Sequence, residues 1–249
     1  MKRNRSILKT TIAATLLGTA FTSSAAFAGL VTFEDHLLTV IDGGQSIVSG
    51  GYTFTAGDSE LAQFVGVTGV AGGVYNGANG CGDTPCPGGN NSNFYVGLND
   101  GSVTVTRNNR VPDFRVGSLD FGFLAPTPGL PDGVWGQLRL TGSLLGGGFI
   151  NTTRDFSGQN LMGDFMFSRW MLDQSFSSTV LNSLTISACM YDDFGDCNNS
   201  LDFPAMNLAQ FGIDNLYLAE VPEPTAPALL ALGALGMALT SRRRAKQAA

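Results

Sequence analysis

Four cysteines, Cys81, Cys86, Cys189 and Cys197, have the most definite chemistry in this sequence of 249 residues. An even number of cysteines indicates disulfide bonds in a chain that leaves the cytoplasm, and four cysteines allow three pairings. We favour Cys81–Cys86 together with Cys189–Cys197, because each bond closes a short local loop. A zinc site is disfavoured, since neither pair has Cys-x-x-Cys spacing and the only histidine, His36, is distant in the sequence.

Catalytic motifs are absent from the sequence. His36 stands without the G-x-S-x-G frame of a serine hydrolase, and no H-E-x-x-H metal motif occurs. Glycoside hydrolysis needs two carboxylates at a fixed separation, but some pair among 20 acidic residues will always be close, so their number identifies no site. We therefore expect a protein that is not an enzyme, with a secreted polysaccharide hydrolase as the least favoured alternative.

The densest group of potential oxygen ligands lies at residues 192–199, DDFGDCNN. Calcium takes carboxylate and amide oxygens in flexible geometry. The spacing does not match an EF-hand loop, and no glutamate closes the segment. We interpret this segment as a solvated acidic turn closed by a disulfide bond.

Short strands dominate the pattern of residues 29–220. Alternating apolar residues recur between turn residues, and long helical periodicity is absent. This pattern indicates one all-β domain, an antiparallel β-sandwich of jelly-roll type. Residues 162–172, which overlap one predicted strand, are also compatible with a short helix. The predicted strands are 30–33, 52–55, 61–67, 94–98, 102–107, 114–124, 134–140, 149–153, 164–170, 184–189 and 211–218.

Two local patterns add detail to this domain. Residues 66–93 are rich in Gly and Asn and nearly uncharged, so we interpret them as a long surface insertion stapled by Cys81–Cys86. Asn99-Asp100-Gly101 predicts a β-hairpin between the strands at 94–98 and 102–107, because these residue types accept the positive φ of tight turns.

The charges are divided unevenly along the chain. Four of the 14 basic residues precede residue 10 and four follow Ser241, so six arginines and no lysine lie between them. All 20 acidic residues lie between Glu34 and Glu223, which gives this part a formal charge of −14. Such a charge disfavours nucleic acid and anionic lipid as partners and favours solubility outside the cell.

The first 28 residues have the pattern of a secretory signal peptide. A basic start precedes an apolar stretch, residues 11–21, which is too short for a comfortable membrane span. Ala26-Phe27-Ala28 is a cleavage site of A-x-A type, so the mature chain is expected to begin at Gly29. No twin-arginine pair occurs, which favours the general secretion machinery as the export partner.

The last 29 residues, 221–249, have three parts in a fixed order. Two prolines make the first part extended, because each fixes its own φ and pushes its predecessor out of the helical region. Residues 225–241 carry no charge and predict a transmembrane helix of roughly 25 Å at ~1.5 Å per residue. A basic end follows and is expected to stay cytoplasmic. The residues that define this pattern are Val221, Pro222, Glu223, Pro224, Arg242, Arg243 and Arg244.

This Pro-Glu-Pro bend, short apolar span and arginine-rich end resemble the PEP-CTERM sorting signal. The resemblance covers residues 221–249 only. It implies export in a Gram-negative bacterium that makes exopolysaccharide, with a precursor anchored in the inner membrane. It also implies recognition by an exosortase, a membrane protease-transpeptidase thought to cut near Pro-Glu-Pro, so that the mature protein resides at the cell surface or outside the cell.

Two further stretches, VTFED at 31–35 and FGIDNLYL at 211–218, resemble the terminal strands of jelly-roll carbohydrate-binding modules. In that family the two strands pair, and acidic residues there hold a structural calcium ion. The resemblance implies the same pairing here and makes Glu34 and Asp214 the expected ligands of a structural calcium ion. No other cofactor is expected.

From these features we expect an exported, non-enzymatic surface or extracellular-matrix protein, sorted by an exosortase and associated with exopolysaccharide or biofilm. A carbohydrate-binding module with a defined glycan site is the alternative. Sugar sites combine aromatic platforms with amides and carboxylates. Tyr75 and Tyr95 are flanked by Asn or Gly, so we expect their rings to be exposed.

Overall fold

The computed structural model describes residues 28–66, 69–82, 84–108, 113–197, 199 and 209–221. Residues 28–220 form one compact unit, which contains every described strand and the described core. Residues 1–27 of the predicted signal peptide 1–28, the 222–224 bend, the predicted transmembrane helix 225–241 and the arginines at 242–244 lie outside the described residues, whereas Ala28 is the first residue of a strand. Within the described part, no helix is long and apolar enough to cross a membrane.

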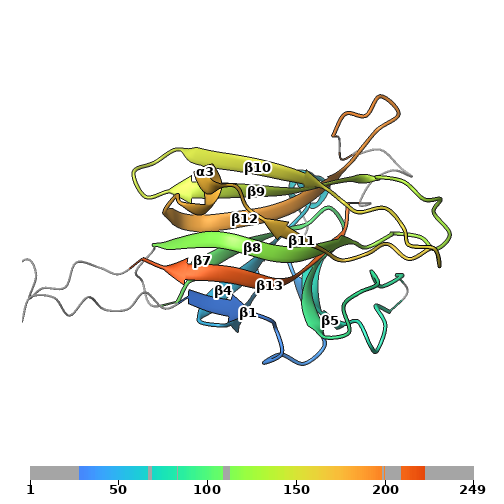
Figure 1. The fold of residues 1–249 in the computed structure, drawn as a ribbon, viewed down its shortest axis with the longest axis horizontal. Coiled ribbons are helices and arrows are strands. Elements are labelled where there is room, and N and C mark those ends of the chain that lie inside the picture. The colour runs from blue at the N-terminus through green and yellow to red at the C-terminus, as the bar shows by residue number, and fades with distance from the viewer. Residues whose placement is uncertain are drawn as a thin grey trace, which may run out of the picture. The chain divides into compact units, whose positions relative to one another are not determined.

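The 13 described strands are antiparallel and connected (Figure 1), and they divide into two sheets that one residue pair, Leu181 of β12 with Phe114 of β8, links. The first sheet has the order β2, β5, β6, β13, β8, β11. Strand β6 pairs with the first part of β13, and β1 pairs with the later part of β13. The second sheet has the order β3, β4, β7, β12, β9, β10. The bounds are β1 (Ala28–Val31), β2 (Thr39–Asp42), β3 (Ser46–Ser49), β4 (Tyr52–Gly57), β5 (Val70–Asn76), β6 (Asn93–Gly97), β7 (Ser102–Arg107), β8 (Phe114–Phe123), β9 (Gly136–Leu144), β10 (Phe149–Asp155), β11 (Ser168–Met171), β12 (Leu181–Met190) and β13 (Phe211–Glu220).

One aromatic-rich core lies between the two sheets, and both contribute to it. Strand β4 shows how the alternation works, because Tyr52 and Phe54 are buried while Thr53 and Thr55 lie on the outer face. Full burial of one such apolar side chain contributes about 1.5–3 kcal/mol. The predicted all-β antiparallel sandwich is therefore confirmed.

The first and last strands of the unit lie side by side, as the resemblance implied. Ala28 pairs with Ala219, and Val31 pairs with Leu216. Strand β13 ends at Glu220, whose carboxylate forms an ion pair of 2.5 Å with Arg107 of β7. The two ends of the folded unit are therefore neighbours at one end of the first sheet.

Residues 60–65 form a helix, α2 (Glu60–Val65), so the strand predicted over 61–67 is wrong. The Ser59 hydroxyl accepts a hydrogen bond of 3.1 Å from the backbone N–H of Ala62 and thus caps the first turn. Gly66 ends the helix in the left-handed conformation, with φ of 71°. These two caps outweigh the weak alternation of the segment. A second short helix, α3 (Gln174–Ser177), was not predicted.

The predicted tight turn at 99–101 is confirmed, but the predicted hairpin is wrong. Asn99 and Asp100 have φ of 54° and 59°, and Gly101 N donates to Leu98 O at 2.8 Å. Strand β6 before the turn belongs to the first sheet, whereas β7 after it belongs to the second. The backbone N–H of Asp100 donates to Ala209 O at 3.1 Å, so the turn is held by the segment leading into β13.

The predicted 66–93 insertion begins with a strand of the sheet, not with a loop. Strand β5 pairs with both β2 and β6. Its glycines are required by packing, because a Cβ at Gly73 would collide with the Thr39 carbonyl and one at Gly72 with the Tyr95 hydroxyl. The surface loop is therefore confined to the connection between β5 and β6.

Candidate functional site

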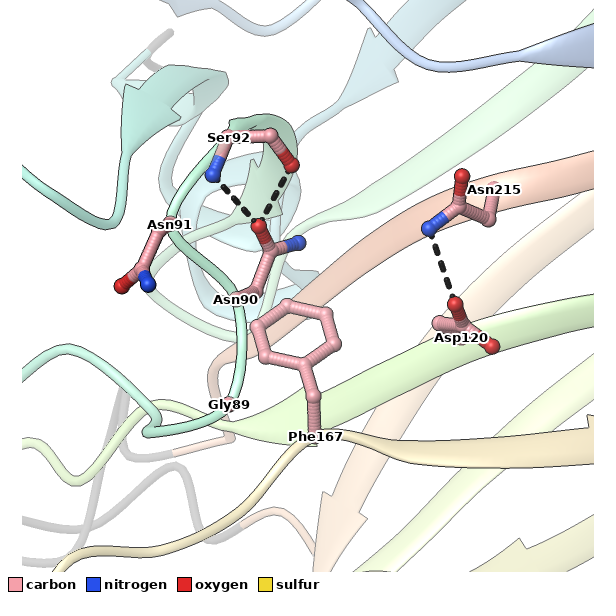
Figure 2. Close-up of a pocket in the computed structure, with 7 residues that line it drawn as sticks. All are labelled: Gly89, Asn90, Asn91, Ser92, Asp120, Phe167 and Asn215. Carbon is pink, nitrogen blue, oxygen red and sulfur yellow. Dashed lines mark hydrogen bonds between the residues drawn. The ribbon is translucent and has the colours of Figure 1, made fainter.

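A cleft of about 400 Å³ lies where three distant segments meet on the first sheet (Figure 2). The loop before β6 forms one wall, β8 and β13 form the floor, and the residue that precedes β11 forms the other side. We call it the amide cleft, because three of its side chains are asparagines. Its lining residues are Gly89, Asn90, Asn91, Ser92, Asp120, Phe167 and Asn215.

A buried carboxylate holds the loop wall of the amide cleft in place. Asp214 is 1% exposed, and its Oδ2 accepts hydrogen bonds from Asn90 Nδ2 at 2.8 Å and from Ser92 Oγ at 3.0 Å. The Asn90 Oδ1 in turn accepts a hydrogen bond from the Ser92 backbone N–H at 2.8 Å. These hydrogen bonds join the loop to β13, although more than a hundred residues separate the two segments in the sequence.

Glu34 anchors the far end of the same loop. Its Oε1 accepts a hydrogen bond of 2.9 Å from the backbone N–H of Asn93, where β6 begins. The Asn93 Nδ2 donates to the backbone carbonyl of His36 at 2.9 Å. Hydrogen bonds therefore join the segment after β1 to the loop before β6.

The floor of the amide cleft contains a carboxylate–amide pair. Asn215 has a φ of 48° at an irregularity in the β13–β8 pairing, and its Nδ2 donates to Asp120 Oδ2 at 2.8 Å (Figure 2). The other oxygen, Asp120 Oδ1, is buried without a hydrogen-bond partner among the described residues. The guanidinium Nε of Arg169 lies 3.4 Å from that oxygen and compensates part of its charge.

Phe167 lies against the sheet because two glycines leave room for its ring. Gly122 and Gly212 are cross-strand partners on β8 and β13. A Cβ at Gly212 would lie 2.8 Å from Phe167 Cζ, and one at Gly122 would lie 3.2 Å from Phe167 Cδ2. An edge-on contact with Phe94, with ring centroids 5.2 Å apart, fixes the ring while leaving it partly exposed to the cleft.

Burial raises the pKa of Asp214 above its ordinary value of 3.8, and the hydrogen bonds from Asn215, Asn90 and Ser92 oppose the rise only in part. Because the folded state then binds the proton more tightly than the unfolded state, the contribution of Asp214 to stability is present at low pH and is lost as the pH rises through the raised pKa. A protonated Asp214 carboxyl group fits these hydrogen bonds, because the Ser92 hydroxyl has a single hydrogen and faces two acceptors, Asp214 Oδ2 and Asn90 Oδ1.

We therefore expect the stability of the wild type relative to Asp214→Asn to fall as the pH rises from about 4 to 7. The variant cannot ionise at this position, so the difference isolates Asp214 from the other carboxylates. Urea unfolding of both proteins at several pH values measures it. A difference that grows with pH would show that the pKa of Asp214 is lowered instead.

The calcium prediction for Glu34 and Asp214 can be compared with this geometry. Asp214 is surrounded by N–H and O–H donors, whereas a calcium ion needs several oxygen lone pairs directed at one point. In the described part of the chain, no three His, Cys, Asp or Glu side chains gather in a metal-binding arrangement. As arranged, these residues do not fit the ion.

The hydrogen-bonded arrangement predicts the same melting temperature in EDTA and in millimolar calcium. A bound ion would instead raise the melting temperature with its concentration, because it would bind the folded state alone. Thermal unfolding in the two buffers measures this directly. A calcium-dependent rise that Asp214→Asn abolishes would support the prediction from the family resemblance.

The four cysteines form the two local disulfide bonds that we favoured. Cys81 pairs with Cys86 and Cys189 pairs with Cys197, with Cα–Cα distances of 5.2 and 5.6 Å. The first bond closes the loop that leads to the amide cleft. The second closes the acidic segment, in which Asp192 Oδ1 accepts hydrogen bonds from the backbone N–H groups of Phe194 and Asp196 at 2.9 Å. This segment has the geometry of an ordinary Asx-type turn.

The other candidate side chains, His36, Tyr75 and Tyr95, have structural roles. The His36 Nε2 lies 2.7 Å from the backbone carbonyl of Val48, which positions the N-terminal segment. Tyr95 is fully buried, so the expectation that it is exposed is wrong; its ring packs 6.0 Å from that of Phe33 in the core. Tyr75 is partly buried against the small cluster around Phe94.

Sequence reasoning identified Asp214 but missed the residues that line the amide cleft. Asn215 stands beside Asp214 in the IDN motif, and Asn90 lies in the Asn-rich segment, so both positions carried a weak signal. Asp120 and Phe167 lie in apolar stretches that read as strand, and only the packing of the chain brings them together.

No family model matches this chain, and no curated protein matches it. One similar solved structure is a mutant of a family 29 carbohydrate-binding module in complex with mannohexaose. It is 13% identical, with a TM-score of 0.31, over 79% of this chain and 93% of that chain. At this level of similarity, the fold is defined by the strand pairing and the site by its own geometry.

Proposed function

We propose that this protein is an exported, non-enzymatic surface protein that binds polysaccharide in the amide cleft. The observation that carries the proposal is the composition of the cleft: amide and hydroxyl groups that donate and accept hydrogen bonds, a carboxylate, and a partly exposed phenyl ring. Sugar hydroxyls can pair with such groups, while the apolar face of a sugar ring packs on an aromatic ring. The volume is within the range of small-molecule sites.

Pre-organisation of the cleft supports binding rather than a purely structural role. Asn90 and Ser92 are held by the buried Asp214, and Asn215 is held by Asp120, so little side-chain freedom remains to be lost when a ligand binds. Asn91 on the rim is exposed to solvent. No catalytic step is proposed, because the cleft offers no assembled nucleophile and base.

Export and sorting form a second part of the proposal, with the secretion machinery and an exosortase as partners. The support comes from the two terminal sequence patterns and from the folded unit Ala28–Glu220, which begins one residue before the expected mature start at Gly29 and ends before the Pro-Glu-Pro motif. Mass spectrometry of the mature protein, from cells with and without the exosortase, tests it. Full-length chain in the cytosol, untrimmed at both ends, would refute it.

Phe167→Ala is expected to weaken binding of the preferred glycan roughly tenfold, because stacking on an aromatic ring of this kind contributes about 1 kcal/mol or more. The measurement is a glycan screen followed by calorimetry with the folded unit 29–220. Phe149→Ala is a matched control, since Phe149 is 71% exposed on the second sheet. Equal losses for the two variants, or no glycan bound by the wild type, would contradict the proposal.

A further inference from the structure

Building on the proposed function, we infer that the sugar unit in the amide cleft carries no negative charge, because Asp120 selects neutral or amino sugars over uronates and sulfated sugars. The accessible oxygen of Asp120, the charges around it and the charge of the whole folded unit produce this selection.

Asp120 presents one oxygen to the cleft. Its side chain is 20% exposed, while Oδ1 is buried beside Arg169. Oδ2 is therefore the oxygen that a ligand can reach, and it already accepts one hydrogen bond, from Asn215 Nδ2 at 2.8 Å. A carboxylate oxygen can accept further hydrogen bonds, so a sugar hydroxyl or ammonium group that donates to Oδ2 would form a charge-assisted hydrogen bond.

The surroundings of Asp120 supply little positive charge. Asp214 is the cross-strand partner of Asp120, so two carboxyl groups stand side by side beneath the cleft. The cation in direct contact with Asp120 is Arg169, which is about half exposed and also donates to Ser118 Oγ at 3.2 Å. The region from Glu34 to Glu223 has six arginines against 20 acidic residues.

A neutral sugar can form hydrogen bonds with the polar side chains of the cleft. The asparagine side chains supply both donors and acceptors, and Asp120 adds an acceptor. A uronate or sulfate would place its own charge against Asp120, and a like-charge contact of this kind costs binding heavily. The cleft should therefore reject acidic polysaccharides even when the rest of the sugar ring fits.

The test compares neutral hexose hexasaccharides with uronate hexasaccharides of equal length, titrated calorimetrically into the folded unit 29–220 at low salt. We expect the neutral ligands to bind at least about tenfold more tightly. Asp120→Asn should reduce this ratio toward one, whereas Arg169→Gln, which removes the neighbouring cation, should increase it. Asp193→Asn is the matched control, because it makes the same charge change on the exposed acidic turn.

Melting temperatures of all variants show whether each one folds, and the opposite shift expected for Arg169→Gln supplies a test that does not depend on Asp120→Asn. Uronates that bind as tightly as neutral ligands, or a ratio that Asp120→Asn leaves unchanged, would overturn this inference while leaving glycan binding intact. Failure of the wild type to bind any glycan would overturn the proposed function and this inference with it.

Discussion

Replacing Asp214 with alanine is expected to lower the free energy of unfolding by about 3 kcal/mol at low pH, where its contribution to stability is present, because buried groups lose their hydrogen-bond partner. These groups are Asn90 Nδ2, Ser92 Oγ and the backbone N–H of Asn215. Since two of them belong to the loop wall of the amide cleft, the same change should detach that wall from the sheet. Urea unfolding of the 29–220 unit measures the first effect, and amide exchange over residues 88–93 measures the second.

Asp193→Ala is the control for this experiment, because Asp193 is exposed on the acidic turn and its removal should change stability by less than about 0.5 kcal/mol. A cost below about 1 kcal/mol for Asp214→Ala would mean that water replaces the lost acceptor. In that case Asp214 would not be the anchor of the cleft wall.

Phe33→Ala is expected to lower the free energy of unfolding by about 4 kcal/mol, because it removes a fully buried ring from the centre of the core. The ring packs edge-on against Phe54, with centroids 4.9 Å apart. The backbone of Phe33 is unusual as well, since its φ of 56° is in the left-handed region that favours glycine. Phe33→Gly should therefore be more stable than Phe33→Ala, by about 1 kcal/mol.

Val103 is the control for the prediction that glycine is more stable than alanine at position 33. It is fully buried in β7, whose regular strand backbone should make Val103→Gly less stable than Val103→Ala by about 1 kcal/mol. Urea unfolding of the four variants measures both orders. An alanine variant more stable than the glycine variant at position 33 would show that the backbone relaxes once the ring is gone.

Strands with strict alternation could be predicted from sequence, and their assignment to a sheet could not. The prediction of 102–107 matches β7, because every second residue there is apolar and buried. The turn at 99–101 was predicted from its Asn, Asp and Gly residues, yet local chemistry does not determine whether a turn closes a hairpin or crosses to the other sheet. That choice depends on contacts with Ala209, more than a hundred residues away.

Glycine caused the other errors in the fold prediction. In β5, Gly72 and Gly73 read as a flexible insertion, but they are there because neighbouring backbone and the Tyr95 hydroxyl approach too closely for a side chain. In α2, the Gly66 cap and the Ser59 cap marked a helix that the apolar alternation obscured. The role of such a glycine depends on its neighbours in space, which the sequence alone does not supply.

The candidate site was predictable only where a motif marked it. Asp214 and Glu34 were found through their resemblance to terminal strands of known modules, and the structure places them at two ends of one loop. Asp120, Asn90 and Phe167 carry no motif, because each comes from a different segment and gains its role from the packing of the sheet. The charge of the whole region, in contrast, was readable from composition and bears directly on ligand choice.

The most direct test of glycan binding in the amide cleft is an NMR titration of the ¹⁵N-labelled 29–220 unit with a neutral hexose oligosaccharide. If a glycan binds in the cleft, the largest amide shifts will cluster at the residues that line it with polar side chains, which are Asn90, Asn91, Ser92, Asp120 and Asn215. No shift at saturating ligand, or a set of shifts centred on another surface such as the outer face of the second sheet, would contradict it.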